Sequence, residues 1–156
     1  MAKRKKVIND PALGKLTFDY LWGGHVPMGP LGEIEILVDG GANESPPTDD
    51  QREAVAQLQQ LMPKLLASLH KAIYKYYCDN RDMYVDLAID PEEDTPELTS
   101  VNEVNKVLRS PPILAVESHL KGEHPELKLR WNVTFDEEHS LSIRLRGGTI
   151  QDVGIE

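Results

Sequence analysis

The four consecutive residues Asp136-Glu137-Glu138-His139 are the part of the sequence best suited to chemistry. Carboxylates beside an imidazole can bind a divalent cation or transfer protons in general acid–base catalysis. Metal sites, however, normally take their ligands from separate elements whose side chains converge. We therefore predict that this cluster is an acidic turn exposed to water, anchored by Glu138 or His139, and that it holds no metal ion.

His25 follows Trp22-Gly23-Gly24, and a histidine in a glycine-lined pocket can act as a catalytic base. A histidine in such a turn also commonly hydrogen-bonds a nearby carbonyl, and we favour this structural role. The enzyme hypothesis that stays open is a metal-dependent hydrolase that uses His25, Glu138 and His139. It requires these three side chains to converge on one pocket.

Other motifs that carry chemistry are missing from the sequence. Gly23-Gly24 and Gly40-Gly41 lack the spacing of a dinucleotide fingerprint or a phosphate-binding loop. Cys78 is predicted at the C-terminal end of a helix, where the helix dipole raises the pKa of a thiol and disfavours a nucleophile. No serine has the setting of a nucleophile elbow. We therefore predict a protein that is not an enzyme and that uses no cofactor.

The charge of the chain indicates what kind of partner it attracts. Lys and Arg number 17 against 26 Asp and Glu, which gives a net charge of −9. Without the four basic residues at positions 3–6, 13 basic residues face 26 acidic ones, a balance of −13. An acidic domain repels nucleic-acid phosphates and anionic lipids and steers basic proteins toward itself. We expect a protein partner, no nucleic acid and no membrane; the alternative interpretation is that the acidity serves solubility.

The cellular setting is predicted from cysteine usage and hydropathy. Cys78 is the single cysteine, so no intrachain disulfide can form. No apolar run approaches the ~20 residues that span a bilayer. The basic segment at positions 3–6 is followed by Val7-Ile8-Asn9-Asp10-Pro11. This stretch contains too few apolar residues to form the apolar region of a signal peptide. We expect a cytoplasmic protein whose residues 1–8 form a disordered basic tail.

A long amphipathic helix is predicted over Thr48–Asn80, and it is the main element that must position any functional side chains. Thr48-Asp49-Asp50-Gln51 has the form of a capping box, and two early aspartates suit the positive end of the helix dipole. Pro63 removes one backbone donor and is expected to kink the helix or split it. The apolar side chains recur at spacings of three and four residues, as on a helix with one buried face; they are Val55, Leu58, Met62, Leu65, Leu69, Ile73 and Tyr76.

Alternating apolar and polar residues predict strands on both sides of this helix. The predicted strands are residues 16–20, 33–39, 113–119, 127–135, 141–146 and 149–153, with a short strand or turn at 22–27. Gly147-Gly148 is a two-residue hairpin turn of the kind that tolerates positive φ. Residues 83–89 are compatible with strand or helix, and Val101–Leu108 predicts a short helix.

The acidic segment Asp90–Glu97 is broken by two prolines and is predicted to be an exposed, mobile loop. With no internal repeat or long linker, residues 9–156 are predicted to form a single α+β domain, in which an antiparallel sheet packs against one long amphipathic helix.

Four short motifs are spread over the chain: Asp10-Pro11-x-x-Gly14-x-Leu16, Trp22-x-Gly24, the helix led by Gln51 and ending in Tyr76-Tyr77, and Trp131-x-x-x-x-Asp136-Glu137-Glu138-His139-x-Leu141-x-Ile143-Arg144 closing on Val153-Gly154. Together they resemble a family of small bacterial proteins of unknown function with an immunity-protein-like character. The resemblance covers most of the chain and implies an α+β fold and a cytosolic partner-binding role, with no catalytic residues. Ser140 departs from the pattern, in which a glycine commonly follows the histidine of the last hairpin.

The function that we expect from these observations is that of an acidic protein-binding module, in the form of an immunity-type inhibitor that neutralises a basic toxin by contact. A structural or interaction subunit with ordinary acidic solubility is the alternative. The expected interface lies in the acidic loop, in the hairpin turn and at the entry of the long helix; its residues are Glu92, Glu93, Asp94, Asp136, Glu137, Glu138, His139, Asp49 and Asp50. A dense acidic face speeds the encounter with a positively charged partner.

Overall fold

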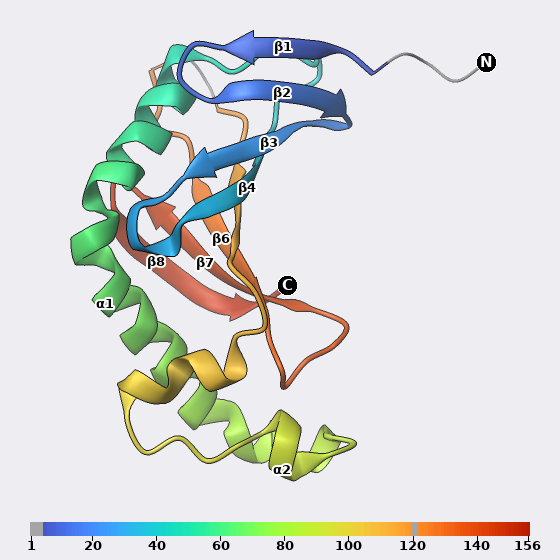
Figure 1. The fold of residues 1–156 in the computed structure, drawn as a ribbon, viewed down its shortest axis with the longest axis vertical. Coiled ribbons are helices and arrows are strands. Elements are labelled where there is room, and N and C mark those ends of the chain that lie inside the picture. Colours follow the sequence, from blue (N-terminus) through green and yellow to red (C-terminus); the bar gives the residue numbers. More distant parts are fainter. Residues whose placement is uncertain (1–4, 120–121) are drawn as a thin grey trace.

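A sheet that curves along one side of a long helix forms the frame of the molecule (Figure 1). The computed structural model describes residues 5–119 and 122–156. Within these residues eight strands form one sheet in the order β1-β2-β3-β4-β5-β6-β7-β8. The strands are β1 (Val7–Asp10), β2 (Gly14–Asp19), β3 (Leu21–Pro27), β4 (Glu33–Val38), β5 (Ile113–Val116), β6 (Leu127–Asn132), β7 (Ser140–Arg146) and β8 (Thr149–Ile155). The helices are α1 (Asp49–Leu87) and α2 (Pro91–Asp94), with 3₁₀ turns η1 (Gly29–Leu31) and η2 (Val101–Val107).

The N-terminus of α1 has the predicted capping box. The Thr48 hydroxyl accepts a hydrogen bond from the backbone N–H of Gln51 at 3.2 Å, and the Gln51 side chain accepts one from the Thr48 N–H at 3.0 Å. Gln51 is buried, and its amide also donates to the carbonyls of Asp39 and Glu117 at 2.9 and 3.1 Å. These bonds fix the start of the helix against the ends of β4 and β5.

The helix is longer than the predicted Thr48–Asn80 and is not split at Pro63. It continues to Leu87, which makes residues 83–87 helical. Pro63 lies beside Gly29 of η1, where an added Cβ would lie 3.7 Å from the Cδ of the proline ring. The loss of one backbone donor is therefore accommodated within a continuous helix that curves around the sheet (Figure 1).

The sheet is larger than predicted, and one of its pairings is parallel. β1 pairs with β2 through Val7↔Thr17, and β4 pairs in parallel with β5 through Ile36↔Leu114. The parallel pairing corrects the expectation of a purely antiparallel sheet, because α1 lies between β4 and β5 in sequence and carries the chain back across the sheet. The coarser prediction of a mostly antiparallel sheet on one long helix is confirmed.

Two segments predicted to be irregular are ordered elements. Val7 and Ile8 belong to β1, and the carbonyl of Lys6 accepts a hydrogen bond from the Phe18 N–H at 2.8 Å. The predicted disordered tail of residues 1–8 is therefore too long. Residues 1–4 of that tail lie outside the described residues. The acidic segment contains α2, whose first turn is capped by the Asp90 carboxylate.

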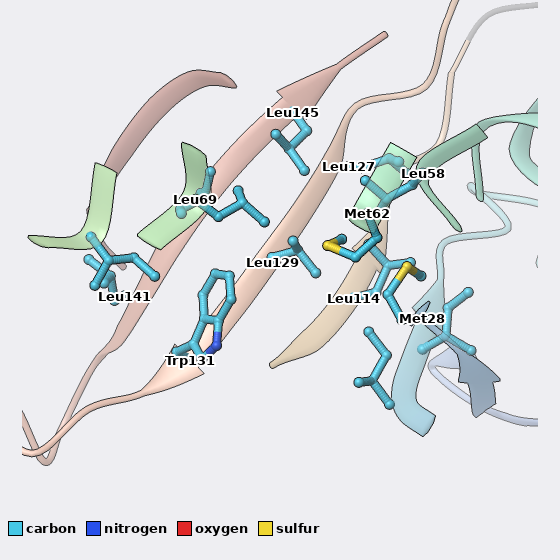
Figure 2. Packing of buried hydrophobic residues seen from close by; sticks show 14 of the residues in the cluster. Met28, Leu58, Met62, Leu69, Leu114, Leu127, Leu129, Trp131, Leu141 and Leu145 are labelled. Atoms are coloured by element: carbon cyan, nitrogen blue, oxygen red, sulfur yellow. The ribbon is translucent and has the colours of Figure 1, made fainter. Parts of the chain in front are cut away.

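The buried face of α1 and the near face of the sheet form a continuous hydrophobic core. Leu58, Met62 and Leu69 of α1 face side chains of β5, β6 and β7 (Figure 2). Trp131 of β6 and Trp22 of β3 are each 2% exposed, so both halves of the sheet contribute a buried indole. No helix in the described residues combines the length and apolarity needed to cross a membrane.

Candidate functional site

A pocket at the far end of α1 brings together two acidic segments that are distant in sequence. It has a volume of about 390 Å³ and lies between the end of α1, α2 and the connection from β6 to β7. The lower part of Figure 1 shows α2 and this connection near the end of the helix. The lining residues are Tyr84, Leu87, Ala88, Ile89, Asp94, Thr134, Phe135, Asp136, Glu137, Glu138 and His139.

Five of the nine predicted interface residues line this pocket: Asp94, Asp136, Glu137, Glu138 and His139. Asp49 and Asp50 lie at the opposite end of α1. Glu92 and Glu93 belong to the same short helix as Asp94 and are exposed, but they do not line the pocket. The structure therefore places the acidic loop and the hairpin turn side by side, which the sequence did not determine.

Asp136 anchors the turn, in place of the predicted Glu138 or His139. Its Oδ1 atom accepts hydrogen bonds from the backbone N–H groups of Glu138 and His139 at 3.1 and 3.0 Å. The same oxygen lies 3.1 Å from Nδ1 of His139. An aspartate that bonds backbone groups two and three residues ahead stabilises a turn locally, and this is the physical reason for the correction.

The other three carboxylates of the pocket differ in their partners. The Glu137 Oε1 atom lies 3.5 Å from Nη2 of Arg109, in an exposed ion pair. Within residues 5–119 and 122–156, neither Asp94 nor Glu138 has an ion-pair partner. Asp94 lines the pocket from α2, and Glu138 lines it from the β6–β7 connection. The pocket therefore has a negative rim whose charge is only partly neutralised by the chain itself.

The floor of the pocket is aromatic. Tyr84 and Phe135 are 5% and 7% exposed, and their ring centroids lie 4.7 Å apart at an interplanar angle of 54°. The Tyr84 hydroxyl is 2.8 Å from that of Tyr76. Burial, then the Tyr76 hydrogen bond and the nearby Asp136 charge, raise the pKa of Tyr84 well above its usual value. Tyr84 therefore stays neutral at physiological pH and acts as a rigid wall.

Side chains of α1 hold the α2 segment in place beside this floor. The Tyr77 hydroxyl donates a hydrogen bond to the carbonyl of Pro96 at 2.5 Å, and Arg81 donates two to the carbonyl of Thr95 at 3.2 and 3.1 Å. From the other side, Thr134 donates to the Asp94 carbonyl at 2.8 Å. These contacts explain why the segment predicted to be a mobile loop has a defined position relative to the turn.

Sequence reasoning missed the exposed apolar residues of the pocket. Leu87 and Ile89 line it although they are 74% and 94% exposed, and Met83, one turn before Leu87, is 50% exposed. The sequence contains a sign of this surface, because residues 83–89 are mostly apolar but have no clear helical or strand period. The pattern does not say whether these side chains are buried, since their exposure depends on where α1 ends.

The residues of the hydrolase hypothesis are only partly brought together. His139 and Glu138 line the pocket, whereas His25 is an exposed residue of β3 that pairs with Glu35 of β4. Among the residues that the structure describes, no three His, Cys, Asp or Glu side chains are grouped closely enough to hold a metal ion.

Comparison with known proteins assigns the chain to a family. The model of the family DUF6985, described as a domain of unknown function, matches residues 12–156. Neither the curated proteins nor the solved structures gave a match. The matched range includes β2 to β8, both helices and every residue that lines the pocket. Because this range is most of the chain, the protein belongs to the DUF6985 family.

Proposed function

We propose that this protein is an acidic protein-binding module that docks a basic partner at the pocket between α1, α2 and the β6–β7 connection. The observation that supports it is the meeting of Asp94 with residues 136–139 around exposed Leu87 and Ile89. An immunity-type inhibitor that neutralises a basic toxin in the cytoplasm is the form of this function that the sequence predicts.

The physical argument combines apolar exposure with charge. Exposed apolar side chains that are rimmed by polar groups are typical of protein interaction sites, because their burial against a partner releases ordered water. Carboxylates around such a patch accelerate the encounter with a positive surface and disfavour acidic competitors. The net charge of −9 acts in the same direction over a longer range.

The proposal is tested by capture of a partner from the native host with three forms of the full-length chain. The double substitution Leu87→Asp and Ile89→Asp should abolish capture of any partner that uses the pocket. The matched control is Tyr20→Asp, because Tyr20 is 91% exposed outside the pocket and has a positive φ of 68°, which aspartate tolerates. A partner retained equally by all three forms would contradict the proposal.

The captured partner is then purified and its affinity measured at two ionic strengths. Raising salt from about 0.1 M to about 1 M shortens the Debye length from about 10 Å to about 3 Å, so steered binding should lose on-rate. An on-rate that does not change with salt would remove the electrostatic part of the proposal. Inhibition of the partner's own activity would distinguish an inhibitor from an interaction subunit.

A further inference from the structure

We infer that the pocket accepts a single arginine side chain of the partner, presented by a segment in which apolar residues flank the arginine. This inference rests on the proposed function and names the chemistry of its ligand. It follows from the charges, the floor and the size of the pocket.

The charges of the pocket leave two carboxylates for a ligand. Asp136 already accepts hydrogen bonds from two backbone N–H groups through Oδ1, which also faces Nδ1 of His139, so this oxygen is occupied within the turn. Asp94 and Glu138 line the pocket from two different segments and form no ion pair with other described residues. A guanidinium between them can donate to both, because its N–H groups spread in a planar fork.

The chain itself shows that a guanidinium suits this rim. Nη2 of Arg109 lies 3.5 Å from Oε1 of Glu137, whose side chain lines the same pocket. Arg109 approaches from beside η2, outside the pocket lining, and leaves the interior to a ligand. The chain thus places one cation outside the rim and two acceptors within it.

The floor of the pocket favours a cation with apolar neighbours. The rings of Tyr84 and Phe135 are almost completely buried beneath the pocket and carry no charge, so they lower the local polarity and strengthen charge-assisted hydrogen bonds above them. Leu87 and Ile89 stand beside this floor and are largely exposed, so residues next to the arginine can bury them.

The size of the pocket gives room for one long side chain together with part of a neighbouring residue. Its volume of about 390 Å³ lies near the lower end of the range of about 300–1,000 Å³ that is usual for ligand pockets. A helix or a folded surface cannot enter such a space, so the rest of the partner must lie over Leu87, Ile89 and α2.

The inference is tested by NMR titration of the full-length protein with two capped tripeptides, Leu-Arg-Leu and Leu-Gln-Leu. The arginine peptide should shift the backbone amide signals of Ile89, Phe135 and Glu138, with saturation in the millimolar range expected of so small a ligand. The glutamine peptide, which is similar in length but uncharged, should bind at least about fivefold more weakly. Equal binding of the two peptides would overturn the inference.

Matched variants locate the charge effect. The double substitution Asp94→Asn and Glu138→Gln should weaken the arginine peptide by about fivefold or more. The control Glu33→Gln and Glu35→Gln removes two exposed carboxylates of β4, outside the pocket, and should leave the affinity unchanged. Equal losses in the two variants would show that only net charge matters, and would also overturn the inference.

Failure of this inference and failure of the proposed function give different results. If the intact partner is lost on Leu87→Asp and Ile89→Asp but neither peptide shifts the pocket amides, the inference is wrong and the binding module stands. If the arginine peptide binds in the pocket but the Leu87→Asp and Ile89→Asp protein captures the partner as well as the native protein does, the arginine site stands and the proposed function is wrong.

Discussion

Asp10 carries a carboxylate that is almost completely buried and fully hydrogen-bonded. One oxygen accepts from the backbone N–H groups of Ala12 and Leu13, both at 2.9 Å, and the other faces Nε and Nη2 of Arg52, both at 2.8 Å. Burial alone would raise the pKa of the Asp10 carboxyl. The hydrogen bonds from Arg52, Leu13 and Ala12 have the larger, opposite effect, so the net pKa lies below the usual 3.8. This pair joins the β1–β2 turn to the first turn of α1.

The first prediction is that Arg52→Gln lowers the free energy of unfolding at pH 7 by about 3 kcal/mol, because it leaves a buried carboxylate without its counter-charge. A folded pKa below 3.8 means that the pair stabilises the protein above that pH and that this contribution is lost as the pH falls through the folded pKa. Urea unfolding at pH 7 and near pH 2 should therefore show a smaller difference between variant and native protein in acid.

The control for this prediction is Lys75→Gln, which removes an exposed ion pair with Asp79. Its effect should stay below about 0.5 kcal/mol at either pH. A loss as large as that of Arg52→Gln would mean that burial is not what makes the Asp10 pair important.

The second prediction concerns the oxygen of Asp136 that anchors the β6–β7 turn. Asp136→Ala removes the acceptor of two backbone N–H groups and should cost about 1–2 kcal/mol in unfolding free energy. It should also speed hydrogen exchange at the Glu138 and His139 amides. Asp136→Asn keeps an acceptor oxygen and should restore most of the protection, which separates the hydrogen bonds from the charge. Equal exchange rates in the two variants would contradict this account.

Residue identity predicted part of the candidate site. The run at 136–139 indicated an acidic turn, and such a turn is present. Which member faces inward was not predictable, because it depends on the backbone angles of the turn. The exposure of Leu87 and Ile89 was missed, since an apolar residue normally indicates the core.

At the scale of elements, Gly24 of β3 lies tightly against Lys15 and Leu16 of β2. A Cβ built on Gly24 would lie 2.6 Å from the carbonyl oxygen of Lys15 and 2.8 Å from Cδ2 of Leu16. Leu16 is fully buried, so its side chain cannot move aside without disturbing the core. The glycine permits this close packing of the two paired strands.

The third prediction follows from this contact. Gly24→Ala should lower the unfolding free energy by about 1–3 kcal/mol, because overpacking must displace backbone or core atoms. Gly154→Ala in β8 is the matched control, since no heavy atom lies within 4 Å of the Cβ position there. Chemical denaturation of both variants measures the difference, and an equal effect of the two substitutions would rule out the steric explanation.

Local patterns predicted the elements well where periodicity was strong. The capping box, the stripe of α1, β4 and the hairpin at Gly147-Gly148 were all predictable, and both glycines have the expected positive φ, 58° and 77°. The end of α1 was not, because residues 81–87 are held helical by contacts of Tyr84 with Phe135 and of Arg81 with Thr95. Those partners lie in other elements, so no local pattern contains them.

At the scale of the molecule, one core connects both halves of the sheet. Residues of β2, β3 and β4 belong to the same buried cluster as those of β5, β6 and β7, with α1 between them. The two tryptophans of the chain lie one in each half, Trp22 in β3 and Trp131 in β6. They provide separate probes of the two halves.

The fourth prediction is that the two halves unfold together. In Trp131→Phe the fluorescence of Trp22 should follow the same denaturant midpoint as far-ultraviolet circular dichroism, and Trp22→Phe should give the same coincidence for Trp131. Each substitution lowers the absolute stability, so the comparison is made within each variant. Separate midpoints for the two probes would show that the sheet consists of two units with independent stability.

The convergence of the acidic segments belongs to this scale and could not be predicted from the sequence. Asp94 meets the β6–β7 connection because Tyr77 and Arg81 of α1 and Thr134 of that connection hold the α2 segment between them. The parallel pairing of β4 with β5 was missed for a similar reason, since it depends on where the long helix returns the chain.

The position of α1 between β4 and β5 also bears on the order of events during folding. The four strands before the helix and the four after it can each form hairpins early, whereas β4 and β5 meet only after α1, α2 and η2 have been accommodated. Pairings between distant segments form late, because the chain must first lose the entropy of closing the intervening loop. Until then both strands present unpaired edges to other molecules. The hazard of aggregation is therefore greatest in the interval before the helix packs, and variants that slow this packing should aggregate even where the native state remains stable.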